Sequence, residues 1–413
     1  MARAIELSGA AFQEQAAGVL RAVRTAFSEI LDVLPNRVRR PNEVAKALGI
    51  DRKLGWNIYK VVQTSDPFMA ADHVPGSSGT HIFLDAARAA RVPAERIDAA
   101  NRAIADFERL IEVHAGDRTT LKMMLASCSP RGRERVDVAH RRAAFRANSY
   151  IWGVQARTQL KADFLHPGAT PGTLDIASLR GFLGLRRIRD NVPWVIARAR
   201  CTDNDGQVRR TFVREALDPF QSSEHEAPLL RPFCTSPLPA LRRLRSAHGF
   251  LEDELVEGPI GNTAAITCIT GEVSRSVASC CRDEHNTHAE LIARMRTPCE
   301  ALVFDQLVYD GLFGPLEPEL GVCSELAGAV PYPTSGAGRQ MLPVFETVTY
   351  LGKGPSVLHT ADVPRYAEMA RFVFDRLGWD GDRFDVYRVR MVFPPIPTSV
   401  VMRYDLLDPP DKR

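Results

Sequence analysis

Thiols and imidazoles crowd together in one stretch of the C-terminal half, which contains Cys268, Cys280, Cys281, His285, His288 and Cys299. Structural zinc sites usually present two closely spaced pairs, such as Cys-x2-Cys with His-x3-5-His. Here the two cysteines at 280 and 281 are adjacent, and only two residues separate the histidines. Adjacent side chains on a strand point to opposite faces. The candidate metal ligands are Cys280, Cys281, His285 and His288, but their spacing favours buried thiols and surface histidines over a metal site.

The remaining motifs predict no catalytic residue and no cofactor. The segments "SGAGRQ" and "LGKGPS" lack the GxxxxGK(S/T) spacing that wraps phosphates and the GxGxxG spacing of dinucleotide sites. No GxSxG nucleophile elbow occurs either. We therefore expect a binding protein rather than an enzyme. The alternative is an enzyme whose thiol chemistry centres on Cys280, Cys281 and His285.

Basic residues coincide with a helical pattern in "RRPNEVAKALGIDRKLGWNIYKVV", which begins at Arg39. Pro41 suits the first turn of a short helix, and Gly49 allows a sharp turn after it. Asp51 can then cap a second helix. The outer face of that second helix would carry Arg52, Lys53, Asn57 and Lys60.

The part "EVAKALGIDRKLGWNIYKVV" resembles the helix-turn-helix of bacterial transcriptional regulators at the level of the superfamily. The matching positions are Ala45, Gly49, Ile50 and Ile58. Gly55 departs from the pattern, because a β-branched packing residue is usual there, and this departure leaves the register of the helix pair open. The alternative interpretation is a helical hairpin with a solvated basic face.

The resemblance implies a DNA-binding protein, because the second helix of this superfamily enters the major groove and its early residues reach base edges. By that analogy Arg52, Lys53 and Asn57 would contact bases. The residues expected to hold phosphates are Arg37, Arg39, Arg40 and Lys60. The following segment, "SDPFMAADHVPGSSGTH", is rich in Pro, Gly and Ser and predicts a loop or a wing-like hairpin, as in a winged helix.

Charge is distributed unevenly along the chain. Residues 1–150 contain 23 Lys and Arg against 17 Asp and Glu, a net charge of +6, whereas residues 151–413 have a net charge of −3. The positive field therefore belongs to the first third, which indicates an anionic partner for that third.

A second apolar stripe suggests how copies of the chain could associate. Its members follow steps of three and four, and they are Ile97, Ala100, Ile104, Phe107 and Ile111. Because regulators of this class commonly read paired half-sites as dimers, we expect a homodimer in which Ile97, Ile104, Phe107 and Ile111 form the contact. An intradomain core helix is the equally weighted alternative.

The spacing of apolar residues changes from a helical to a strand pattern near "HPGATPG", which begins at His166. This segment predicts a domain boundary. Residues 1–165 are expected to form an all-α domain, and residues 170–413 an α+β domain with a mostly antiparallel sheet. Within the latter we expect hairpins over 192–217 and 263–279, a helix over 287–295, strands over 299–309, 344–351, 384–393 and 399–407, and a helix between Asp362 and Gly378. By fold-level analogy this domain would bind a small-molecule effector or self-associate. A scaffold protein whose helix pair binds protein is a further alternative.

The amino-acid composition indicates the class of protein and its expected location in the cell. Hydrophobic content of 45% and charged content of 25% are typical of a soluble globular chain. No uncharged apolar run approaches the roughly 18 residues of a membrane span, and the charged N-terminal stretch differs from a secretory signal. We therefore expect a cytoplasmic protein without a membrane partner, in which the eight cysteines are free thiols.

Overall fold

The computed structural model describes residues 9–34, 40–190, 192–199, 214–220, 226–245, 250–256, 258–284, 287–313, 316–326 and 339–408. The chain divides into two compact units, Met1–Ala139 and His140–Arg413, called here the helical unit and the β unit. The predicted boundary at His166 is therefore too late. "HPGATPG" is the connection between two paired strands, so its Pro and Gly residues form a turn rather than a linker.

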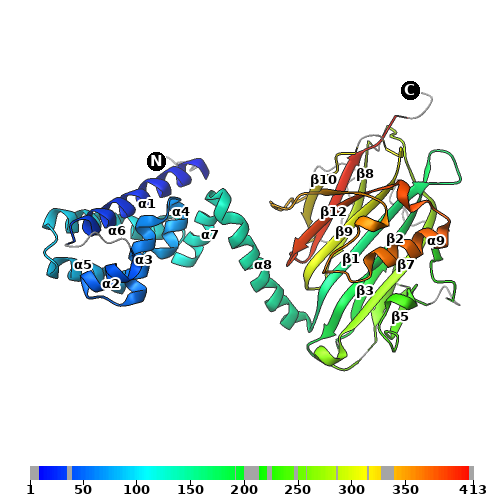
Figure 1. Cartoon of the computed structure of the whole chain (residues 1–413), viewed down its shortest axis with the longest axis horizontal. Helices are drawn as coiled ribbons and strands as arrows, with labels where there is room; N and C mark the ends of the chain where they lie inside the picture. The colour runs from blue at the N-terminus through cyan, green and yellow to red at the C-terminus, as the bar shows by residue number, and fades with distance from the viewer. Residues whose placement is uncertain are drawn as a thin grey trace, which may run out of the picture. The chain divides into compact units, whose positions relative to one another are not determined.

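The helical unit contains only helices among its described residues (Figure 1). They are α1 (Gly9–Asp32), α2 (Pro41–Leu48), α3 (Arg52–Gln63), α4 (Pro67–Ala70), the 3-10 turn η1 (Ala71–His73), α5 (Ser77–Ala89), α6 (Ala94–His114) and α7 (Arg118–Cys128). A further helix, α8 (Pro130–Trp152), begins in the helical unit and ends in the β unit. The prediction of a wing-like hairpin after α3 is wrong, because the segment "SDPFMAADHVPGSSGTH" is mostly helical. Asp66 caps α4 by accepting a hydrogen bond from the Phe68 amide at 2.9 Å, which starts a helix where a loop or hairpin was expected.

The stripe on α6 lies inside the helical unit. Ile97, Ile104 and Phe107 are 4%, 7% and 2% exposed, and they belong to the same core as Phe27 of α1. Ile111 packs against that core. The assignment of these residues to a dimer contact is therefore corrected: their apolar surface is covered within one chain, and α6 is the intradomain core helix of the alternative interpretation.

The β unit is built on a seven-stranded sheet with the order β11-β12-β9-β1-β2-β7-β4. Its strands are β1 (Val154–Pro167), β2 (Thr173–Arg187), β4 (Arg214–Ala216), β7 (Ile266–Ser279), β9 (Cys299–Tyr309), β11 (Thr349–Lys353) and β12 (Phe384–Val392). Neighbouring strands are antiparallel except for β1 and β9, which are parallel. The expected α+β architecture with a mostly antiparallel sheet is thus confirmed for this unit.

Two smaller sheets and one helix complete the β unit. The smaller sheets have the orders β10-β13-β8 and β3-β6-β5. Their strands are β3 (Trp194–Ala199), β5 (Leu241–Arg245), β6 (Leu251–Leu255), β8 (His288–Met295), β10 (Glu319–Ser324) and β13 (Thr398–Asp405). Helix α9 (Tyr366–Leu377) covers one face of the large sheet, where its residues pack on Leu160, Phe164 and Val303 (Figure 1). In a second core, Phe304 and Met391 of the large sheet pack with Met402 of β13.

Three local expectations for the β unit are wrong. The strands of the predicted 192–217 hairpin belong to different sheets, because β3 pairs with β6 and β4 pairs with β7. The predicted 263–279 hairpin forms the single strand β7, and Gly271 within it lies against the side chains of Leu230 and Leu217 rather than making a turn. Residues 288–295 form β8 instead of a helix, because β13 pairs along their whole length.

Among the described helices, none combines the length and the apolar character that a membrane span needs.

Candidate nucleic-acid interface

The turn between α2 and α3 has the geometry that its sequence predicts. Gly49 adopts the left-handed conformation at φ 63°, and the amide of Ile50 donates to the carbonyl of Ala45 at 3.0 Å. This pattern ends α2 with a Schellman motif, for which glycine is the favoured residue. The Asp51 carboxylate then accepts a hydrogen bond from the Lys53 amide at 2.8 Å and caps α3. As a result α3 begins at Arg52, directly after the turn.

Gly55 explains how closely the two helices pack. A Cβ atom placed on Gly55 would lie 2.9 Å from both the Cβ and the backbone nitrogen of Ala45. The backbone of α3 therefore rests directly on α2 at this point. This residue is the departure from the helix-turn-helix pattern, and here the missing side chain allows contact between backbones where a β-branched residue would hold the helices apart.

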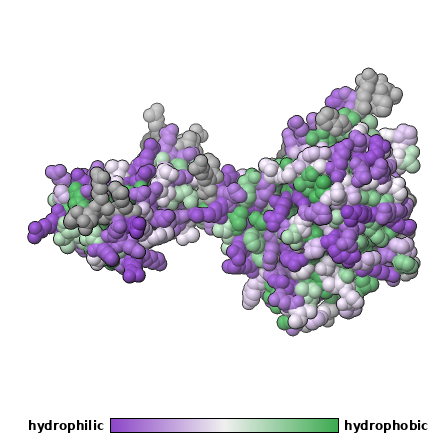
Figure 2. Space-filling view, in the orientation of Figure 1, coloured by the Kyte–Doolittle hydropathy of each residue, from purple (hydrophilic) through white to green (hydrophobic). Residues whose placement is uncertain are grey.

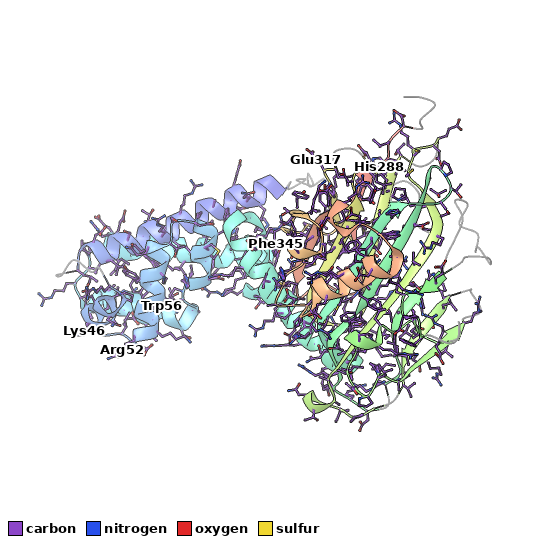
Figure 3. All side chains as sticks on the ribbon, turned by 45° about the vertical axis from the view of Figure 1, so that its right-hand side comes forward. Lys46, Arg52, Trp56, His288, Glu317 and Phe345 are labelled. Carbon is purple, nitrogen blue, oxygen red and sulfur yellow. The ribbon has the colours of Figure 1, made fainter. Side chains whose placement is uncertain are left out.

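Cations on α2 and α3 lie on the outer face of this pair. Arg52 and Lys53 are exposed, Asn57 and Lys60 are partly exposed, and Lys46 of α2 is exposed. Figure 3 shows Lys46, Arg52 and Trp56 along the same side of the helical unit, and the region around α2 and α3 is mainly hydrophilic in Figure 2. None of these cations forms an ion pair with a carboxylate in the part of the chain that the structure describes.

Three arginines were expected to hold phosphates just before α2. Arg40 is exposed, and its backbone amide donates to Glu43 at 3.1 Å, so its side chain extends from the start of α2. Arg37 and Arg39 lie outside the described residues. The structure therefore places Arg52, Lys53, Asn57 and Lys60 on α3, and Arg40 at the N-cap of α2.

An aromatic cluster beside these cations was missed by the sequence reasoning. Trp56 is 41% exposed, its ring meets that of His73 at 5.0 Å edge to face, and the Lys60 ammonium lies 5.7 Å from its centroid. Burial lowers the pKa of the His73 imidazole, and the positive charges of Lys60, Lys122 and Arg135 lower it further. Spacing of four residues from Arg52 could have indicated Trp56, because such residues share a helix face. No local signal could have indicated His73.

The metal candidates do not converge. His288 lies on β8, where its Nε2 is 2.9 Å from Asp405 (Figure 3), and His285 lies outside the described residues. Cys280 and Cys281 have their sulfurs 3.8 Å apart, so the expectation that they point to opposite faces is wrong. The reason is that β7 ends at Ser279, before either cysteine. Within the described residues no three Cys, His, Asp or Glu side chains are grouped as metal ligands. The seven described cysteines form no disulfide, and Cys201 lies outside the described residues.

The β unit contains one pocket of about 370 Å³. Its walls are mainly apolar and include Leu185, Pro237, Leu255 and Ile266. The neighbouring Arg187 guanidinium is 3% exposed and donates to the carbonyls of Leu255 at 2.7 Å and Val256 at 3.0 Å. This arginine therefore holds the β6 end of the pocket in place. A volume of this size lies in the range of small-molecule sites.

Comparison with known proteins gives no relative: no family model, no curated protein and no solved structure matches the chain.

Proposed function

We propose that the chain is a DNA-binding transcriptional regulator whose helical unit contacts duplex DNA through α3. The observation that carries this proposal is the exposed start of α3, where Arg52 and Lys53 follow a capped turn and have no carboxylate partner among the described residues. Cations that are free of internal partners can release counterions from phosphates when they bind. A helix that is held rigidly by the Gly55 contact can enter the major groove without rearrangement.

The contacts divide by position on the helix pair. Arg52, Lys53 and Asn57 lie on the first half of α3 and would reach base edges. Arg40 and Lys60 lie at the start of α2 and towards the end of α3, where they would hold phosphates. Arg37 and Arg39 would add to the phosphate contacts. The homodimer is part of this proposal, but its contact lies outside the buried stripe of α6.

The β unit would bind the effector of such a regulator. Its pocket has mainly apolar walls, and of the two arginines in its lining Arg187 is buried and hydrogen-bonded to backbone carbonyls, whereas Arg186 is partly exposed. The ligand would therefore be a largely apolar small molecule. Nile red, a neutral apolar dye, is expected to bind the full chain, and Ala265→Phe, which fills the pocket, should abolish that binding.

The test of DNA binding is fluorescence anisotropy of the full chain with random duplex DNA across a salt series. Arg52→Ala/Lys53→Ala should lower affinity at least about 10-fold and reduce the salt slope by about 2. A duplex selected from a random library should lose more affinity than random DNA in this variant, because base contacts discriminate between sequences.

Arg102→Ala/Arg109→Ala is the charge-matched control, because it removes two exposed arginines from the outer face of α6. This control should change affinity by less than about 3-fold if α3 is the docking element. Equal losses of DNA affinity in the two double variants would mean that only the net charge of the chain matters, and would contradict docking through α3. Failure of the full chain to bind any duplex at low salt would overturn the proposed function.

A further inference from the structure

The paired cysteines at the end of β7 form a preorganised dithiol. Their Sγ atoms are 3.8 Å apart. The Cys280 amide donates to the Gly172 carbonyl at 3.0 Å, and Cys281 forms a β-bridge with Leu407. The Ser279 hydroxyl also lies 3.1 Å from the Cys281 amide. Backbone contacts on both sides thus hold the two side chains next to each other.

These two thiols differ from the described cysteines that are buried in strands. Both are partly exposed, whereas Cys268 and Cys299 are fully buried in strands. Burial raises the pKa of the Cys268 and Cys299 thiols far above the usual range, which keeps them in the unreactive protonated form. The dithiol is therefore the place in the described chain where two thiols can react together with one solute.

The sulfur spacing fits a single bent centre. Two sulfurs bound at about 2.3 Å to a pyramidal trivalent centre, whose angles are smaller than tetrahedral, lie roughly 3.4 Å apart, a few tenths of an ångström closer than the observed 3.8 Å, whereas a linear centre would need about 4.6 Å. A disulfide fits less well, because adjacent Cα atoms lie about 3.8 Å apart and disulfides usually span about 4.4–6.8 Å. Oxidation of the pair would thus be strained, and the dithiol form is favoured.

We propose that Cys280 and Cys281 chelate trivalent arsenicals of the type R–As(OH)2. Such a compound needs only two thiols and is pyramidal at arsenic, so it matches a site with two sulfurs at a bent spacing. Each thiol transfers its proton to an arsenic-bound hydroxyl, two As–O bonds break, two As–S bonds form and two waters leave. Arsenic stays trivalent, so no oxidant or reductant takes part. This inference does not depend on DNA binding.

Intact-protein mass spectrometry with phenylarsine oxide tests the site on the full chain. One phenylarsenic group per chain should bind with the loss of two thiol hydrogens, and dithiothreitol should remove it while an equal concentration of a monothiol does not. Cys280→Ser and Cys281→Ser should each weaken binding at least about 100-fold, because a second bond within one chelate gains from a high effective concentration.

Cys128→Ser and Cys201→Ser are the matched controls and should bind the arsenical like the unmodified chain. Peptide mapping adds a readout that needs no variant: phenylarsine oxide should protect Cys280 and Cys281, and no other cysteine, from iodoacetamide. Full binding in Cys280→Ser, or protection of a different pair, would overturn the proposal. So would zinc that stays bound to the pair at one equivalent after dialysis, because that requires additional ligands.

Discussion

In the β unit, guanidinium groups lie against carboxylates in the interior: Arg388 binds Asp305 through two hydrogen bonds of 2.8 and 2.7 Å, and Arg243 binds Asp253 at 2.7 and 2.9 Å. In the helical unit, the described ion pairs join exposed side chains, as in Arg88–Asp85 and Lys122–Asp72. The cations of α2 and α3 have no carboxylate partner among the described residues. Exposed pairs such as Arg282–Asp408 occur in the β unit as well, so the two units differ in the buried pairs, which the described part of the helical unit lacks.

The difference between buried, paired cations and exposed, unpaired cations indicates where an anionic partner can bind. A buried guanidinium has lost its hydration and depends on its carboxylate, so it is fixed in the fold and cannot serve an external ligand without a large cost. An exposed cation without a carboxylate contributes little to folding. It can therefore be replaced without loss of stability, and its removal should affect binding alone.

The largest expected effect comes from breaking a buried ion pair of the β unit. Arg388→Met leaves the Asp305 carboxylate, which is 0% exposed, without its partner and should lower the free energy of unfolding by about 3–5 kcal/mol. Arg52→Met on α3 should change it by less than about 0.5 kcal/mol. Urea unfolding followed by circular dichroism measures the free energy of unfolding of both variants. Equal losses in the two variants would contradict the proposed difference between buried and exposed cations.

Asp305→Leu/Arg388→Met tests the reason for that loss. Removing both charges leaves no unpaired buried charge, so this variant should recover most of the stability lost in Arg388→Met. A double variant as unstable as the single one would instead attribute the loss to packing of the Arg388 side chain on the Tyr366 ring, 5.6 Å away.

A pH-dependent effect is expected from Lys161 of β1. Its ammonium pairs with Asp163, which also accepts a hydrogen bond from Ser178 at 2.5 Å. Burial lowers the pKa of Lys161 from 10.5 to about 8. Between these values the unfolded chain holds a proton that the folded chain has lost, so the contribution of Lys161 to the free energy of unfolding should rise with pH, by up to about 3 kcal/mol.

Lys161→Met should remove this rise. In a Trp56→Phe background the remaining tryptophans, Trp152, Trp194 and Trp379, all lie in the β unit, so their fluorescence reports its unfolding alone. The comparison is the change in unfolding free energy between pH 8 and pH 10 in the two chains. An identical change would mean that Lys161 keeps an ordinary pKa in the folded protein.

A smaller effect is expected where α3 meets α2. Gly55→Ala places a methyl group 2.9 Å from Ala45 and should cost about 1–3 kcal/mol by overpacking. It should also weaken DNA binding, because α3 must shift. Gly18→Ala is the matched control: no atom lies within 4 Å of the added Cβ on α1, so the better helix propensity should stabilise by about 1 kcal/mol. Circular dichroism at 222 nm follows both.

The sequence predicted those elements whose signals are local. Helices α2 and α3 follow from the helical pattern of this stretch, from Asp51 and from Gly49. Helix α9 follows in the same way, with its end at Gly378 as expected, although its N-cap is Arg365 rather than Asp362. The cations of α3 could be placed on an outer face because helical period alone decides that face.

The errors fall where distant segments decide the structure. Pairing with β13 makes β8 a strand, and close packing against Leu230 explains Gly271 in β7, but neither partner can be seen locally. The α6 stripe could be recognised as apolar, yet only the packing of α1 shows what covers it. The same holds for the site: His73 reaches Trp56 through the fold, and the Cys280–Cys281 contact depends on where β7 ends.

The smallest expected effect compares two similar helix ends in the helical unit. Arg91 ends α5 with the bonds that Gly49 makes at α2: the Val92 amide donates to Ala87 at 3.1 Å, and φ of Arg91 is 61°. A side chain costs about 1 kcal/mol in this conformation. Arg91→Gly should therefore stabilise the unit by about that amount, and Gly49→Ala should destabilise it similarly.

Arg91→Ala separates the backbone effect from the loss of a charge. Alanine keeps the Cβ atom that makes this conformation unfavourable, so this variant should unfold at the urea concentration of the unmodified chain. If Arg91→Ala stabilises as much as Arg91→Gly, the gain comes from removing a cation, and the exposed positive charges of the helical unit then repel one another enough to matter. In that case the unpaired cations of α3 would destabilise the fold by mutual repulsion rather than leave its stability unchanged. An anionic partner would then stabilise the helical unit on binding, because it would relieve that repulsion.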